Sequence, residues 1–171
     1  DAIASFEAAK PLAATIAQSL RKTGRLLLLG MGGSHAVSRA VEPLYRSLGI
    51  DAVALPLSEQ LGQPVPISGE TVLVTSQSGE SAEVLRWFAE AGVAPDTFGL
   101  TLEGGSTLAR TVPSLVGAGG TENAFAATRS LTVSFALHLA VLTALGDDPS
   151  AALERLQRGS TAQIDAAVKA L

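Results

Sequence analysis

Three serine hydroxyls, those of Ser76, Ser78 and Ser81, lie within the segment 76–81, whose sequence is Ser-Gln-Ser-Gly-Glu-Ser. The segment follows an apolar run of strand length and precedes a stretch of helical period. Hydroxyls and free backbone amides at the positive end of a helix can bind a dianionic phosphate without a lysine. A capping box is the alternative, but it accounts for only one or two hydroxyls and leaves Gln77 unexplained. A nucleophile elbow is excluded, because glycines are absent two positions before and after Ser78.

A second candidate for anion binding is the turn 30–35, which reads Gly-Met-Gly-Gly-Ser-His. Gly32 and Gly33 allow backbone N–H groups to turn toward an anion, and Ser34 at the start of the next helix can add a hydroxyl. A dinucleotide-binding fingerprint requires a third glycine where His35 stands, and no Walker A sequence follows any predicted strand. The alternative is a tight strand–helix turn in which Ser34 caps the helix.

Apolar runs of strand length alternate along the chain with longer segments of helical period. Such alternation predicts an α/β fold, a three-layer αβα sandwich in which a parallel sheet is covered by helices on both faces. Ligands of these sheets bind beyond the carboxyl ends of the strands, where both candidate loops lie. Pro11 predicts a break in the first helix or the start of a second one, and 62–69 is expected to be a connecting loop. We expect strands at 25–29, 52–55, 71–75, 97–101 and 114–116, and helices at 1–22, 34–48, 80–91, 123–145 and from 148 onward.

The composition predicts a globular chain and restricts its partners. Of the 171 residues, 47% are hydrophobic and 16% are charged, with a mean hydropathy of +0.34. The formal charge of −4 gives no basis for binding nucleic acid or an anionic membrane, and the absence of cysteine excludes disulfides and thiolate chemistry. With no apolar stretch of about 18 residues and no signal peptide, we expect a cytoplasmic location. The start at Asp1 and the end within helical sequence predict a piece of a longer chain.

With both loops identified, the sequence resembles the phosphosugar-binding loops of the SIS (sugar isomerase) family. The residues that carry the resemblance are Gly32-Gly33-Ser34 and the segment 76–81. Further matches are Ser58-Glu59 after the second strand, Gly120-Thr121-Glu122 and the segment 126–129, Ala-Ala-Thr-Arg. This last stretch is similar to the first SIS domain of glucosamine-6-phosphate synthase and of related sugar-phosphate isomerases and deaminases. The resemblance implies a five-stranded parallel sheet of flavodoxin-like type and a hexose or amino-hexose 6-phosphate as the ligand.

The resemblance also implies a set of site residues and no cofactor or metal. Ser81 stands where threonine is commoner, which keeps the hydroxyl. Ala127 and Arg129 stand where serine and lysine are more usual, which leaves the sugar contacts of that loop open. The residues implied to bind the phosphosugar are Gly32, Gly33, Ser34, Ser76, Gln77, Ser78, Gly79, Ser81, Glu122 and Ala127.

Aldose–ketose isomerisation requires a base that moves a proton between adjacent carbons. Glu59 and Glu122 are the two carboxylates expected near the site, and each also fits a structural or ligand-orienting role. In two-domain relatives the acid, base and lysine come from a second SIS domain and the C-terminal tail. The resemblance therefore implies the N-terminal half of such an isomerase, aminotransferase or deaminase, inactive alone. The alternative is a non-catalytic SIS domain that senses a phosphosugar within a regulator.

The domain division that we predict has a helical segment at 1–24, the SIS domain at 25–146 and a helix at 147–171 that leads to a second SIS domain. The helix predicted at 123–145 is strongly apolar, so we expect a second SIS domain or a homodimer partner to cover part of it. His138 on this helix is expected to be packed or at an interface. Trp87 and Phe88 are expected to serve in packing rather than in stacking on a sugar.

Overall fold

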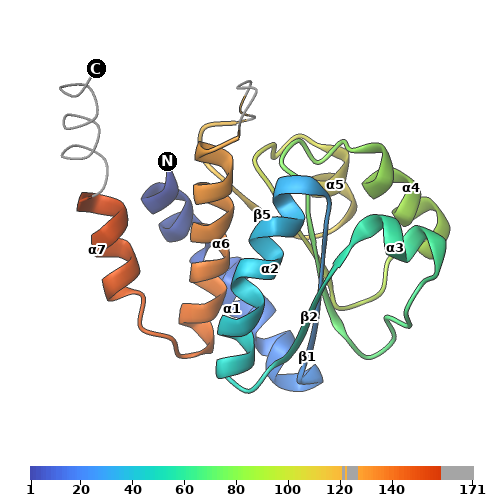
Figure 1. Cartoon of the computed structure of the whole chain (residues 1–171), viewed down its shortest axis with the longest axis horizontal. Coiled ribbons are helices and arrows are strands. Elements are labelled where there is room, and N and C mark those ends of the chain that lie inside the picture. The colour runs from blue at the N-terminus through green and yellow to red at the C-terminus, as the bar shows by residue number, and fades with distance from the viewer. Residues whose placement is uncertain (121, 123–126, 159–171) are drawn as a thin grey trace.

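Five parallel strands form the central sheet in a computed structural model of the chain, which describes residues 1–120, 122 and 127–158 (Figure 1). The strand order is β2-β1-β3-β4-β5, and every neighbouring pair is parallel. This arrangement confirms the predicted five-stranded αβα fold. The strands are β1 (Arg25–Gly30), β2 (Asp51–Pro56), β3 (Thr71–Thr75), β4 (Thr97–Thr101) and β5 (Ser114–Val116).

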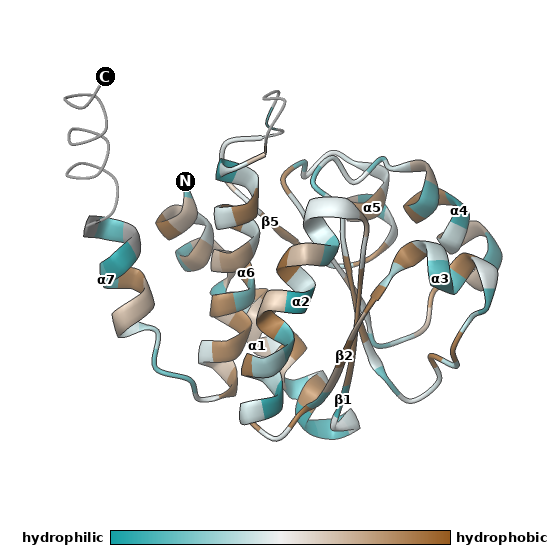
Figure 2. Ribbon diagram, in the orientation of Figure 1, coloured by the Kyte–Doolittle hydropathy of each residue, from teal (hydrophilic) through white to brown (hydrophobic). Residues whose placement is uncertain are grey.

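Helices cover both faces of the sheet and enclose two separate apolar cores (Figures 1 and 2). One core lies between the sheet and α1, α2 and α6, and the other between the sheet and α3, α4 and α5. Alternate residues of β1 and β3 contribute to the two cores, so these central strands are apolar along most of their length. The helices are α1 (Ala2–Thr23), α2 (Gly32–Ser47), α3 (Leu57–Gly62), α4 (Ala82–Ala91), α5 (Thr107–Thr111), α6 (Arg129–Leu145) and α7 (Ser150–Arg158).

Helix α1 is continuous through Pro11, and the predicted break at this residue is therefore wrong. Pro11 lies on the exposed face, whereas Phe6 and Ile16 on either side of it are buried in the core that α6 shares. Packing of this apolar stripe holds the helix together across the missing hydrogen bond. The helix ends at Gly24, whose φ is 67° and whose N–H donates to Leu20 O at 2.8 Å.

Helix α6 packs against α1 and α2 and contributes to the core that they share. It begins at Arg129 rather than at 123, and the predicted helical residues 123–126 lie outside the described residues. Most of its apolar side chains are buried within this chain, whereas Leu131, Phe135 and Leu145 are half-buried, so the cover by a partner stays a prediction. His138 is fully buried and its Nδ1 lies 3.1 Å from the Tyr45 hydroxyl, which confirms that the histidine is packed. Burial lowers the pKa of His138 to about 4.

Two short helices lie in segments for which the sequence pattern predicts neither a helix nor a strand. Helix α3 lies between β2 and the predicted 62–69 loop, whose first residue it includes, and it carries Ser58 and Glu59. Helix α5 follows β4 by a short turn. Both are too short for a helical period to be recognisable in the sequence.

Trp87 of α4 is 1% exposed, and its ring centroid lies 4.9 Å from that of Phe88, so packing is the role of this pair.

Candidate functional site

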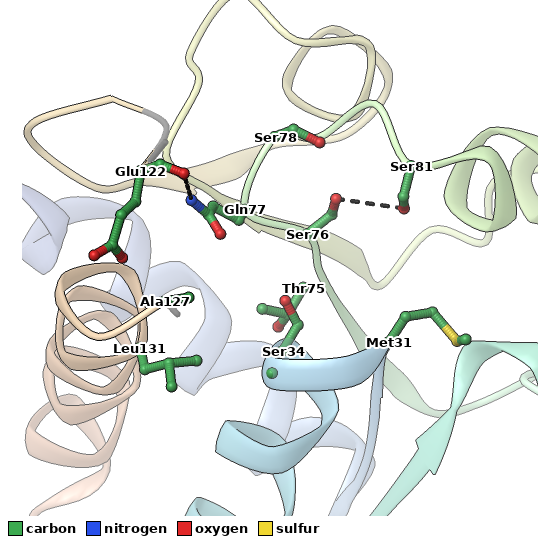
Figure 3. Close-up of a pocket in the computed structure, with 11 residues that line it drawn as sticks. Met31, Ser34, Thr75, Ser76, Gln77, Ser78, Ser81, Glu122, Ala127 and Leu131 are labelled. Carbon is green, nitrogen blue, oxygen red and sulfur yellow. Dashed lines mark hydrogen bonds between the residues drawn. The ribbon is translucent and has the colours of Figure 1, made fainter. Parts of the chain in front are cut away.

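The two predicted loops and the segment before α6 meet in one pocket at the carboxyl ends of β1 and β3 (Figure 3). The pocket has a volume of about 320 Å³. Most of the residues expected at the site line it, although they come from three distant parts of the chain. Gly32 and Gly79 belong to the same loops without lining the pocket. The lining residues are Met31, Gly33, Ser34, Thr75, Ser76, Gln77, Ser78, Ser81, Glu122, Ala127 and Leu131.

The loop after β3 presents its hydroxyls beside the start of α4. Ser76 Oγ accepts a hydrogen bond from Gly79 N at 3.1 Å and donates to Ser81 Oγ at 3.5 Å. Ser78 Oγ accepts from Glu80 N at 3.2 Å. Ser81 is the N-cap residue of α4, but its side chain makes no capping hydrogen bond. The first backbone amides of α4 therefore lack a side-chain acceptor, and the positive end of the helix is open to an anion.

Gly79 and Glu80 hold this loop against α5 rather than facing the pocket. Gly79 has a φ of +64°, and a Cβ added to it would lie only 2.5 Å from the Cβ of Ser106. Its carbonyl accepts from Leu108 N at 3.1 Å. The carboxylate of Glu80 accepts from Thr107 N at 2.5 Å, and this hydrogen bond lowers the pKa of Glu80. The Gly-Glu pair of the motif thus has a structural function in this chain.

The loop after β1 brings a second helix start to the pocket. Helix α2 begins at Gly32, and its N-cap residue Met31 makes no side-chain hydrogen bond. A Cβ on Gly33 would lie 3.0 Å from Leu131 Cδ2, so a glycine here allows α2 to approach α6 closely. Ser34 lies in the first turn with its side chain half-buried at the pocket. The amino ends of α2 and α4 therefore converge on one space.

Glu122 caps the amino end of α6 with its carboxylate. It accepts hydrogen bonds from the backbone N–H groups of Ser130 at 2.9 Å, Thr128 at 3.1 Å and Arg129 at 3.3 Å, and from Ser130 Oγ at 2.8 Å. These bonds, those from Ser130 first, lower the pKa of Glu122 to about 2. A carboxylate held in its ionised form in this way is a poor proton acceptor, so the geometry favours the structural role over the catalytic one.

Gln77 links the loop after β3 to the segment that contains Glu122. Its Nε2 donates to the backbone carbonyl of Glu122 at 3.3 Å (Figure 3). This contact joins two loops that are 45 residues apart in the sequence. It accounts for the amide side chain between the serines, which a capping box leaves unexplained.

The other candidate base, Glu59, lies on α3 and does not line the pocket. Its side chain is exposed, because α3 folds onto the second core directly after β2. The structure adds Met31, Thr75 and Leu131 to the residues expected at the site. Met31 and Thr75 are neighbours in sequence of predicted site residues, and this adjacency could have identified them. Leu131 reaches the pocket only through the packing of α6.

The part of the chain that the structure describes restricts the chemistry of the pocket. Glu122 is the one ionisable side chain among its described lining residues. The described residues contain no group of three or more histidine or acidic side chains that could hold a metal ion. None of the described helices is both long and apolar enough to span a membrane.

No protein-family model and no curated protein sequence matches the chain, but several solved structures share its fold. A Silicibacter pomeroyi protein assigned as a phosphosugar isomerase is 26% identical, with a TM-score of 0.67 over 86% of this chain and 48% of its own. The tagatose-6-phosphate ketose/aldose isomerase of Escherichia coli is 21% identical, with a TM-score of 0.64 over 82% of this chain and 43% of its own. The sugar isomerase domain of the RpiR transcription factor from Sphaerobacter thermophilus is 22% identical, with a TM-score of 0.61 over 91% of this chain and 92% of its own. The chain therefore shares the fold of sugar isomerase (SIS) domains, as expected from the resemblance of its two loops.

Proposed function

We propose that this domain binds a hexose or amino-hexose 6-phosphate, with the phosphate at the loops after β1 and β3. The observation that supports it best is the convergence of the amino ends of α2 and α4, and of four serine hydroxyls, on one pocket. The four are Ser34, Ser76, Ser78 and Ser81. Backbone amides and partial positive helix charges suit a dianion more than a neutral sugar.

A cradle of this type binds phosphate without a fixed cation. The described lining residues include neither lysine nor arginine. The anion would be held by hydrogen bonds from hydroxyls and amides, each stronger than a neutral one because the acceptor is charged. The remaining volume of the pocket, toward Glu122 and Leu131, would take the sugar.

The enzyme context that we favour is the N-terminal half of a two-domain sugar-phosphate isomerase, or of a glucosamine-6-phosphate synthase or deaminase-like enzyme. The chain spans about half the length of the Silicibacter and Escherichia coli proteins that it matches. Glu122 is occupied in capping α6, so the proton-transfer groups would come from a second SIS domain or a homodimer partner. The isolated domain is then expected to bind ligand without isomerising it.

The second candidate is a phosphosugar-sensing domain of a regulator. The RpiR sugar isomerase domain favours it, because that domain and this chain match over nine-tenths of both lengths. A second SIS domain in the parent sequence would support the enzyme, whereas a basic helix-turn-helix segment would support the regulator.

Calorimetric titration of the domain with fructose 6-phosphate and glucosamine 6-phosphate, beside the unphosphorylated sugars, tests the binding function. We expect dissociation constants of about 0.1–5 mM for the phosphates, since an open half-site buries little of its ligand. Equal affinity for the unphosphorylated sugars would contradict the proposal. Proton exchange in D₂O on the same samples tests catalysis, and rapid exchange at C1 or C2 would show that this domain holds a base of its own.

A further inference from the structure

Thr75 lines the pocket and has a buried hydroxyl that makes no hydrogen bond. The residue ends β3, is 1% exposed and lines the pocket. Among the described residues, it is the only pocket-lining residue with a buried side-chain polar atom that lacks a partner. The buried atoms without a partner are His35 Nδ1, Thr75 Oγ1, Thr97 Oγ1, His138 Nε2 and Thr143 Oγ1.

Thr75 and Ser76 serve opposite sides of the pocket. Successive side chains of a strand point to opposite faces of the sheet. Thr75 lies on the face of Leu73, whose core includes α6, whereas Val74 belongs to the core that includes α4. Ser76 Oγ accordingly lies near Ser81 at the start of α4, and Figure 3 shows Thr75 on the opposite side, near Ser34.

The sheet neighbours of Thr75 offer its hydroxyl no side-chain partner. In register with it stand Gly30 of β1 and Leu100 of β4. A buried hydroxyl without a hydrogen bond destabilises the free protein, and a valine of nearly the same shape would remove that penalty. The hydroxyl therefore contributes favourably only when a partner from outside the chain reaches it.

We propose that Thr75 Oγ1 hydrogen-bonds to the sugar part of the ligand, on the α6 side of the pocket, while the phosphate lies at the amino ends of α2 and α4. This inference rests on the proposed function and deepens it. The ligand would be a sugar phosphate with a hydroxyl or carbonyl oxygen directed at the floor of the pocket beside Leu131. Thr75 is then a specificity-determining residue, because it distinguishes sugar phosphates by the position of that oxygen and contributes nothing to inorganic phosphate.

The test compares Thr75→Val with Thr97→Val. Thr97 is also a buried threonine at a strand end with an unpartnered hydroxyl, but it lies at the amino end of β4, outside the pocket. Calorimetry would measure fructose 6-phosphate and inorganic phosphate on each protein, and thermal melts would measure stability. We expect Thr75→Val to weaken fructose 6-phosphate roughly 5- to 50-fold and to leave inorganic phosphate unchanged. Thr97→Val should bind both ligands as the unaltered protein does, and Thr75→Ser should retain most of the sugar phosphate affinity.

The stability of the ligand-free protein distinguishes a binding role of the Thr75 hydroxyl from a structural role. Without ligand, Thr75→Val should be as stable as the unaltered protein or more stable, and a clear loss would overturn the inference. The inference would also be overturned if Thr75→Val bound fructose 6-phosphate within about twofold of the unaltered protein. The same holds if it lost as much affinity for inorganic phosphate as for fructose 6-phosphate. If the valine variant failed to fold, Thr75→Ala beside Thr97→Ala would serve for the same binding comparison. Should the unaltered protein bind neither ligand, the proposed function itself fails.

Discussion

The carboxylate of Glu122 binds both the backbone N–H and the hydroxyl of Ser130, at 2.9 Å and 2.8 Å. These bonds tie Glu122 to the first turn of α6. Gln77 of the loop after β3 donates to the backbone carbonyl of the same residue. The pocket wall beside α6 therefore depends on a helix cap rather than on a strand end.

Glu122→Gln should lower the melting temperature by about 2–6 °C at neutral pH, because the amide is a weaker acceptor for the amino end of α6. The pKa of Glu122 in the folded protein is about 2, below its ordinary value of 4.5. Its contribution is thus fully present above about pH 5 and is lost as the pH falls toward 2. Thermal melts from pH 7 to pH 2 should show the two proteins converge in this range. A difference that is unchanged down to pH 2 would contradict the capping role.

Ser78→Ala should weaken a hexose 6-phosphate roughly 5- to 150-fold, since a charge-assisted hydrogen bond contributes about 1–3 kcal/mol. Binding of the unphosphorylated sugar should change far less. Ser47→Ala is the matched control, because Ser47 is an exposed serine at the far end of α2 whose Oγ donates only to Leu44 O. Calorimetry that finds equal losses for sugar and sugar phosphate would remove Ser78 from the phosphate site.

Gly79→Ala should destabilise the domain by about 2–4 kcal/mol, because the alanine Cβ would meet Ser106 and its φ would be left-handed. Gly49→Ala measures the cost of the left-handed φ alone, without a steric contact. Gly49 has a φ of +82° with nothing within 4 Å of an added Cβ, so Gly49→Ala should cost only about 1 kcal/mol. Chemical denaturation of both variants measures the difference. Equal losses would show that the contact with Ser106 contributes nothing.

His138→Gln should reduce the loss of stability on acidification. The pKa of His138 is lowered by burial to about 4, so the unfolded chain takes up a proton between pH 6.5 and 4 while the folded chain stays neutral. Stability from this residue is complete above pH 6.5 and falls by about 2–3 kcal/mol as the pH drops to 4. Glutamine keeps a hydrogen-bonding group for the Tyr45 hydroxyl. Urea titrations of both proteins at pH 7 and pH 4 check this, and an identical acid loss in the variant would refute it.

The local sequence pattern is sufficient to predict the sheet and the two loops that line the pocket. Strands 71–75, 97–101 and 114–116 have the predicted bounds, because short apolar runs between glycines and prolines leave few other conformations. Most of the loop residues that line the pocket after β1 and β3 are also predicted, since the carboxyl ends of parallel strands share one edge of the sheet.

Tertiary packing decided the remaining features of the site. Helix α1 passes through Pro11 because the core on both sides holds it, and α6 is apolar because α1 and α2 cover it. Leu131 enters the pocket, and Glu122 becomes a cap rather than a free carboxylate, only when α6 docks beside α2. The periodicity of the sequence does not indicate such contacts, because they join residues that are distant along the chain and are formed by the packing of whole helices.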